Sequence, residues 1–205
     1  MTPALVRLPA AMLVDGACEQ LAACARAVGA GRTVVVGQQR TTDGHPLDEF
    51  VVATAIAARA PGVAIGVATR ARGGRHASVI AREATTAQLL GACDVLVLDG
   101  DAAACADAAA IITALFTAGE HTLARGAERI DHARNVPLPD VEGGPGIVWR
   151  DGDALCTLVD GVPARCGIVE MVAPGEPLPA PDPGTLVELE HPVALAADLA
   201  ASLSA

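Results

Sequence analysis

The sequence predicts an α/β fold in which parallel strands alternate with helices in a single domain. Short apolar runs, several of them rich in valine, alternate along the first half of the chain with alanine-rich stretches of helical length. Runs without a polar residue are typical of strands buried on both faces, and such strands form parallel sheets with right-handed crossovers. The 205 residues have room for one sizeable core, so we expect one domain over residues 1–205.

The first half of the chain is expected to repeat the order strand, helix. Residues 33–37 form a β-branched run of buried-strand length, and Asp15 has the side chain of a helix N-cap. Strands are predicted at 5–8, 33–37, 63–67 and 94–98, and helices at 15–28, 47–60, 75–90 and in an alanine-rich stretch that ends near Phe116. We expect the strands at 33–37, 63–68 and 94–98 to be parallel neighbours within one sheet.

The alternation weakens after Phe116. Residues 117–146 contain several glycines and prolines, which predict an irregular excursion, and residues 174–183 predict a proline-rich irregular segment. The remaining elements are expected to be strands at 147–149, 166–171 and 185–189, a short helix at 154–159 and a closing helix at 192–203.

Charge and composition exclude two classes of partner. The chain has 14 Lys and Arg against 24 Asp and Glu, a formal net charge of −10, which disfavours a phosphate backbone. Phe50, Phe116 and Trp149 are the only aromatic residues, so few side chains can stack on bases and no nucleic acid is expected. No apolar run approaches the ~18 residues of a membrane span, and the start lacks the pattern of a signal peptide. We therefore expect no membrane segment and a cytoplasmic location.

The cysteines and histidines do not predict a metal site. None of the six cysteines forms a C-x-x-C pair, and Cys18 and Cys24 lie in an apolar helical pattern where a thiol acts as a small hydrophobe. His121, His132 and His191 have no ligand spacing with one another.

One passage carries a family resemblance. A buried strand ends in a glycine- and arginine-rich loop at 66–75, and a helix then begins near Arg75-His76 and continues through Glu83. This passage resembles the third β/α unit of the luciferase-like flavin- or F420-dependent oxidoreductases. Weaker matches in the same order extend the resemblance over roughly residues 15–162.

The resemblance implies a (β/α)₈ barrel, which usually needs ~250 residues. Because this chain is shorter, we expect a shortened or incomplete TIM-type barrel of parallel βα units. The segment after residue 98 leads almost directly into a helix where relatives have an insertion, and the C-terminal third is compressed. An incomplete barrel would expose strand edges or apolar surface, so we expect a homodimer or a complex with a related subunit.

The resemblance also implies an activity and a cofactor site. It predicts an oxidoreductase or monooxygenase that uses FMN or F420 on a small organic substrate, with the cofactor supplying the difficult chemistry. It assigns contact with the cofactor to Gly66, Val67, Ala68, Thr69 and Arg75. Two other interpretations stay open: Gly66 is compatible with a packed strand, and Arg70, Arg72 and Arg75 are compatible with a solvated loop.

The expected catalytic positions differ from the family pattern. Gln38 and Gln39 stand where the resemblance expects an acidic residue and a histidine, and an amide cannot carry a proton between pH 5 and 8. His45 lies in a loop predicted at the carboxyl end of a strand, where active sites of α/β barrels gather, although Asp43-Gly44 is also an ordinary turn signal. His45 and Gln39 are thus the candidates for catalysis.

Two further residues are candidates for binding substrate. Gln38 and Asp99 both follow predicted strands, but Asp99 and Asp101 are also compatible with capping the next helix. His76 is expected to cap or flank a helix. The alternative function is a non-catalytic paralogue that acts as a partner subunit or as a small-molecule binder.

Overall fold

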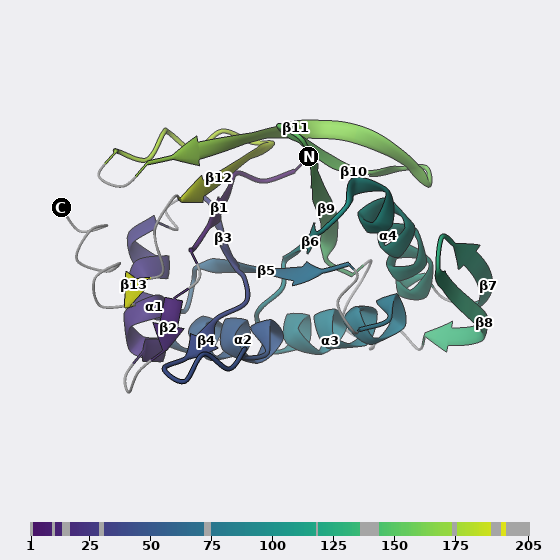
Figure 1. The fold of residues 1–205 in the computed structure, drawn as a ribbon, viewed down its shortest axis with the longest axis horizontal. Coiled ribbons are helices and arrows are strands. Elements are labelled where there is room, and N and C mark those ends of the chain that lie inside the picture. The colour runs from purple at the N-terminus through teal and green to yellow at the C-terminus, as the bar shows by residue number, and fades with distance from the viewer. Residues whose placement is uncertain are drawn as a thin grey trace.

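The centre of the molecule is a closed barrel of eight strands that follow one another around the barrel in chain order (Figure 1). The computed structural model describes residues 2–9, 11–13, 17–28, 31–71, 75–117, 119–135, 144–173, 176–189 and 194–195. The barrel strands are β1 (Leu5–Arg7), β3 (Thr33–Val36), β5 (Ala64–Arg70), β6 (Val95–Asp99), β9 (Gly146–Asp151), β10 (Ala154–Val159), β11 (Val162–Val172) and β12 (Thr185–Leu189). Each is parallel to its barrel neighbours except β10, which is antiparallel to both β9 and β11.

The two halves of the barrel are connected differently. The helices that link successive strands all lie in the first half: α1 (Ala17–Val28), α2 (Glu49–Arg59), α3 (Ala77–Leu89) and α4 (Ala102–Phe116). In the second half, tight hairpins join β9 to β10 and β10 to β11. Figure 1 shows α2 and α3 along one side of the barrel and the long β11 on the other. Hairpins in place of helices let a short chain close the barrel.

Several expectations are confirmed and others are corrected. The α/β class is confirmed, and so is the parallel pairing of β3 with β5 and of β5 with β6. The expectation of uniformly parallel βα units is wrong because β10 runs the other way. The barrel is also closed rather than incomplete, so exposed barrel edges give no reason for a dimer.

The predicted helix at 154–159 is the strand β10. Asp-Gly turns stand at both of its ends, at residues 151–152 and 160–161, and Gly152 and Gly161 have φ of 62° and 78°. Asp160 also has a positive φ of 51°, so Asp160-Gly161 forms the type I′ turn of a two-residue hairpin loop. Because a tight turn reverses the chain at each end of the apolar run, the run pairs with β9 and β11 as a strand instead of forming a helix.

Part of the predicted irregular excursion at 117–146 is an ordered hairpin. Strands β7 (Gly119–Arg125) and β8 (Glu128–Asn135) pair with each other and pack against α4. A small second sheet joins β13 (Ala194–Leu195), β2 (Ala11–Leu13) and β4 (Arg40–Thr41). The closing helix expected at 192–203 is therefore wrong at 194–195, and its remaining residues, like Asp15, lie outside the described residues.

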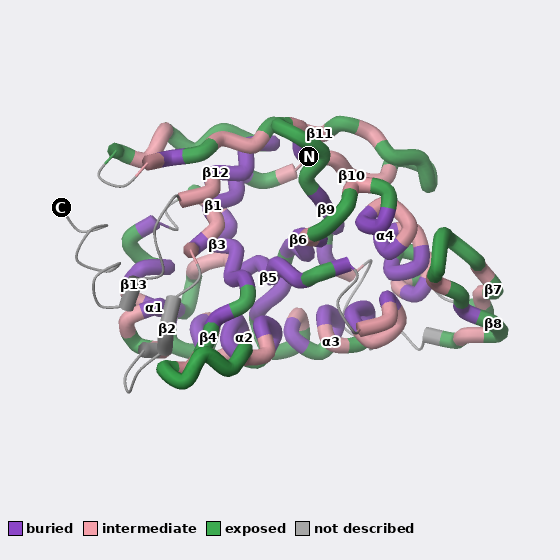
Figure 2. Tube along the Cα trace, in the orientation of Figure 1, coloured by how far each residue is buried: buried purple, intermediate pink, exposed green. Residues whose placement is uncertain are grey.

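The core has two layers, one inside the barrel and one between the barrel and the helices. The interior layer consists of Leu5, Val35, Ala68, Val95, Val97, Val148, Leu155 and Leu186. The outer layer includes Ile65, Val67 and Trp149, and Figure 2 shows it as buried segments where helices and strands meet. Cys24 lies there too, and burial raises the pKa of its thiol to about 11. No helix among the described residues is long and apolar enough to cross a membrane.

Candidate functional site

The interior of the barrel ends in charged side chains at the carboxyl end of the parallel strands. Side chains alternate between the two faces of a strand, so the second residue after an interior residue also faces inward. The interior residues Leu5, Ala68, Val97, Val148 and Leu186 are followed in this way by Arg7, Arg70, Asp99, Arg150 and Glu188. We call these last five residues the charged layer. Active sites of α/β barrels lie at this end.

Ion pairs join members of the charged layer across the mouth of the barrel. Arg7 Nη1 donates to Asp99 Oδ1 at 2.7 Å, and Arg7 Nη2 contacts Asp99 Oδ2, so the pair is two-pronged. Arg7 Nη1 also lies 3.3 Å from Glu188 Oε1, while Arg150 Nη1 lies 3.0 Å from Glu188 Oε2. Burial alone would lower the pKa of Arg7, but the two carboxylates outweigh it and raise that pKa. The guanidinium group therefore stays charged.

Gly37 makes room for the Arg7 side chain. Gly37 follows the interior residue Val35 by two positions, and a Cβ atom built on it would lie 3.2 Å from Arg7 Nη2. A larger residue would push against the guanidinium group that forms the ion pairs. Gly37, directly after β3, therefore leaves the space in which the Arg7 side chain forms its ion pairs.

Arg70 differs from the other arginines of the charged layer because none of the described residues serves as its counter-ion. It lies opposite Asp99 in the pairing of β5 with β6, yet Asp99 binds Arg7 instead. Within the described part of the chain, the Arg70 side chain makes no hydrogen bond or ion pair. Three arginines against two carboxylates give the charged layer a formal charge of +1, and Arg70 is the unpaired group.

Two cavities lie beside the Arg7–Asp99 pair. The first, of about 320 Å³, is lined by Arg70, Gln38 and Ala68 as well as by the pair itself. The second, of about 470 Å³, is lined by Arg150, Asp101 and Glu188 and again by the pair. Because Arg7 and Asp99 line both cavities, their ion pair forms the shared wall.

A second ionic cluster lies at the rim of the first cavity. The buried Glu49, the first residue of α2, accepts a hydrogen bond from the Thr69 hydroxyl and lies 3.0 Å from Arg75 Nη1. Arg75 also contacts Asp48 at 2.5 Å and Glu83 at 3.2 Å. Burial raises the pKa of Glu83, and Arg75 opposes that rise. With three carboxylates around one guanidinium group, Arg75 is already neutralised.

The structure brings together some of the residues predicted from the sequence. The first cavity is lined by Gln38, Ala68, Thr69, Arg75 and Asp99. Two expectations about helix caps are confirmed as well. His76 is the N-cap of α3, where its ring accepts from Ser78 N, and Asp101 is the N-cap of α4.

Other predicted site residues lie away from this cavity. His45 is exposed in the turn after β4, where its backbone nitrogen bonds to Thr41 Oγ1, and it lines neither cavity. Gln39 is fully buried and donates to the carbonyl of Gly37 at 3.2 Å. Val67 faces the helices. Gly66 lies deeper in the barrel, and a Cβ atom there would come within 3.0 Å of the Val95 carbonyl oxygen.

Four residues of the site, Arg7, Arg150, Glu188 and Glu49, are not among those predicted from the sequence. Arg7, Arg150 and Glu188 could have been proposed from the sequence. Each is a charged residue two positions beyond an apolar residue near the end of a predicted strand, so it faces the same side as that apolar residue. Glu49 follows Asp48, which accepts from the backbone nitrogens of Phe50 and Val51 as the N-cap of α2. An acidic pair at a helix start is an ordinary capping pattern, so its position at the cavity could not be inferred.

Comparisons with protein-family models and with curated proteins find no match to this chain. Among the described residues, no group of three or more His, Cys, Asp or Glu side chains is arranged to hold a metal ion. The site is therefore defined by its arginines and carboxylates.

Proposed function

We propose that this chain binds a small anionic organic molecule at the mouth of its barrel, as a non-catalytic relative of the luciferase-like oxidoreductases. The observation that carries the proposal is the unpaired guanidinium group of Arg70 in the wall of the first cavity. Arginine forms two parallel hydrogen bonds with a carboxylate or phosphate, and its charge is kept at every physiological pH. The volume of about 320 Å³ suits a small ligand.

Binding is favoured over acid–base catalysis by what surrounds Arg70. Gln38 has no titratable proton, and Gln39 is buried against the backbone. The carboxylates that line the first cavity, Asp99 and Glu49, are each held by an arginine. These groups are suited to orient a ligand.

An oxidoreductase that uses FMN or F420 is the second candidate. It is supported by Ala68 and Thr69, which line the cavity at the end of β5, where the resemblance expects the cofactor ring. A cofactor phosphate would suit Arg70. The ring would not fit well, because Ala68 is the one apolar residue among the described residues of the cavity wall.

Isothermal titration calorimetry tests the proposal. The wild-type protein should bind succinate and inorganic phosphate, and Arg70→Gln should weaken that binding about tenfold or more because a charge-assisted hydrogen bond is lost. Arg82→Gln is the matched control, since Arg82 lies outside both cavities, and it should bind as the wild type does. Absence of anion binding would overturn the proposal, whereas tight binding of FMN or F420 would favour the second candidate.

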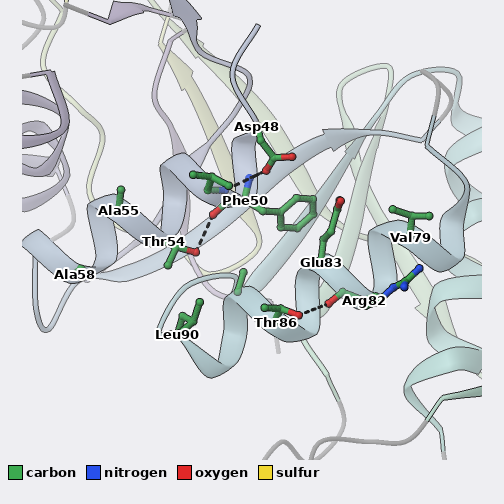
Figure 3. A pocket seen from close by; sticks show the side chains of 12 residues that line it. Asp48, Phe50, Thr54, Ala55, Ala58, Val79, Arg82, Glu83, Thr86 and Leu90 are labelled. Atoms are coloured by element: carbon green, nitrogen blue, oxygen red, sulfur yellow. Dashed lines mark hydrogen bonds between the residues drawn. The ribbon is translucent and has the colours of Figure 1, made fainter. Parts of the chain in front are cut away.

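We also propose a homodimer formed through the outer face of α2 and α3. A groove of about 860 Å³ runs between these helices, and Figure 3 shows Phe50 of α2 and Glu83 of α3 with their side chains between them. Val51 is 67% exposed and Leu90 is 60% exposed beside the groove. Exposed apolar residues grouped in this way are typical of an interface.

Charge favours a second copy as the occupant of the groove. Arg82 and Glu83 are neighbours on the α3 wall, and among the described residues the Arg82 guanidinium group forms no ion pair, although its charge lowers the pKa of Glu83 slightly against the rise caused by burial. In a two-fold contact the same patch meets itself, so Arg82 of each copy can approach acidic groups of the other.

Sedimentation velocity at micromolar concentration tests the dimer. The wild-type protein should sediment as a dimer, and Val51→Glu or Leu90→Glu should give a monomer because each introduces a charge into the apolar contact. Val162→Glu is the control, because Val162 is 63% exposed on β11, away from the groove. A monomeric wild-type protein would contradict this proposal.

A further inference from the structure

We propose that Arg7 is a second anion subsite, which Asp99 occupies from within the chain, and that the ligand is a small dianion whose second acidic group displaces Asp99. This inference rests on the proposed function, since it assumes that the first acidic group binds Arg70. It narrows the ligand class to molecules with two carboxylates, or with a carboxylate and a phosphate.

The Arg7–Asp99 pair has the two-pronged geometry with which an arginine can also bind an acidic ligand. Each terminal nitrogen of Arg7 contacts one carboxylate oxygen of Asp99: Nη1 lies 2.7 Å from Oδ1, and Nη2 contacts Oδ2. An arginine binds the carboxylate or phosphate of a ligand with the same two-pronged arrangement. Both side chains remain partly exposed, at 24% for Arg7 and 32% for Asp99, so a ligand can reach the pair.

The position of the pair connects the two subsites. Arg7 and Arg70 line the same cavity of about 320 Å³. Their strands β1 and β5 are separated only by β3, which places the strands about 10 Å apart, and both side chains point into the barrel. A small dianion can therefore bind Arg70 with one acidic group and Arg7 with the other.

Asp99 has another cation available when it leaves Arg7. Arg150 lines the second cavity together with Asp99, and it follows Trp149, which pairs with Leu98 in the register of β6 with β9. Arg150 therefore lies beside Asp99 on the neighbouring strand. Arg150 already pairs with Glu188 at 3.0 Å, so a turn of the Asp99 side chain toward Arg150 lets the two carboxylates share that guanidinium group while Arg7 takes the ligand. The same turn opens the wall between the cavities.

Calorimetric titration of the full chain with succinate and with acetate tests this inference. Asp99→Asn keeps the shape of the side chain but removes the two-pronged carboxylate from Arg7, while Glu188 stays 3.3 Å from Arg7 Nη1. Succinate should therefore bind about tenfold more tightly and acetate should change much less. Arg7→Lys keeps the charge but loses the two-pronged geometry, so it should reduce the preference for succinate over acetate.

Asp101→Asn is the matched control for the loss of one negative charge. Asp101 lines the second cavity without contacting Arg7, and asparagine is as good an N-cap as aspartate, so α4 should be retained. If Asp99→Asn and Asp101→Asn tightened succinate binding equally, the inference would be overturned, because the gain would then come from the loss of one negative charge near the mouth of the barrel and not from freeing Arg7. Weaker binding in Asp99→Asn would also overturn it.

The same titrations separate this inference from the proposed function. If the wild-type protein binds acetate or succinate through Arg70 and Asp99→Asn leaves both affinities unchanged, the proposed function stands and the second subsite is wrong. If neither the wild-type protein nor Asp99→Asn binds any anion, both fail. Circular dichroism of each variant verifies that the fold is retained.

Discussion

At the scale of single residues, the environment of Gly66 separates a packing role from a ligand-binding role. A Cβ atom at this position would lie 3.0 Å from the Val95 carbonyl oxygen and 3.3 Å from Thr33 Cγ2, both inside the barrel. A Cβ atom at this position therefore fits only if the neighbouring strands β3 and β6 give way by a few tenths of an ångström. Two positions further along the same face, Ala68 lines the cavity at the mouth.

Gly66→Ala should therefore destabilise the protein without weakening its binding of anions. We expect a loss of about 1–3 kcal/mol in the free energy of unfolding, because the added methyl group forces two backbones apart. Urea unfolding measures this loss, and calorimetry with succinate measures the affinity of the folded variant. Gly146→Ala is the control, since nothing lies within 4 Å of a Cβ atom there. A loss of affinity at unchanged stability would instead assign Gly66 to the ligand site.

The residue scale also shows how far a site can be predicted from a sequence. Positions within the resembling passage, such as Thr69 and Arg75, could be proposed from the sequence because they belong to a recognisable strand and loop, and both line the first cavity. Arg7 and Glu188 are separated by 181 positions yet bind each other. Their contact depends on closure of the barrel between β1 and β12, which no local pattern indicates.

At the scale of elements, the hairpin from β10 to β11 explains both an incorrect prediction and the shortness of the chain. A run of six apolar and small residues fits a strand or a buried helix equally well, so periodicity alone could not decide. The Asp-Gly pairs at its two ends are the stronger signal, because Gly152 and Gly161 both have positive φ and Asp160-Gly161 forms a type I′ turn, which needs positive φ at both central residues. In the first half, longer segments with helical spacing and clear caps made the elements predictable.

Gly161→Ala tests the importance of this turn. Gly161 has a φ of 78°, and nothing lies within 4 Å of a Cβ atom there, so the cost is one of backbone conformation alone. We expect the free energy of unfolding to fall by about 1–2 kcal/mol, the penalty of the left-handed region for an L-residue. Thermal unfolding followed by circular dichroism measures it. An unchanged stability would show that the turn does not hold β10 against β11.

At the scale of the whole molecule, closure makes the two unlike halves of the barrel depend on each other. β1 pairs with β3 of the first half and with β12 of the second, and β6 pairs with β9 at the other junction. The Arg7–Asp99 and Arg150–Glu188 pairs add contacts across the mouth. Neither half can separate without breaking a strand pair on each side.

The chain should therefore unfold in one cooperative step, and two probes can test this because each reports on a different half. All four helices of the described residues lie between 17 and 116, so circular dichroism at 222 nm follows the first half. Trp149 is the only tryptophan, it is 2% exposed on β9, and its fluorescence follows the second half. The two urea transitions should have the same midpoint, and the hairpin variant Gly161→Ala should lower both midpoints equally.

This measurement is best made in the Leu90→Glu background at one protein concentration, because dimerisation would otherwise add to the apparent stability. Gly146→Ala, made in the same background, should leave both midpoints in place. If Gly161→Ala lowered the fluorescence midpoint alone, the second half would be an independent unit. The strand pairs β1–β12 and β6–β9 and the ion pairs of the charged layer would then be too weak to make the two halves of the barrel unfold together.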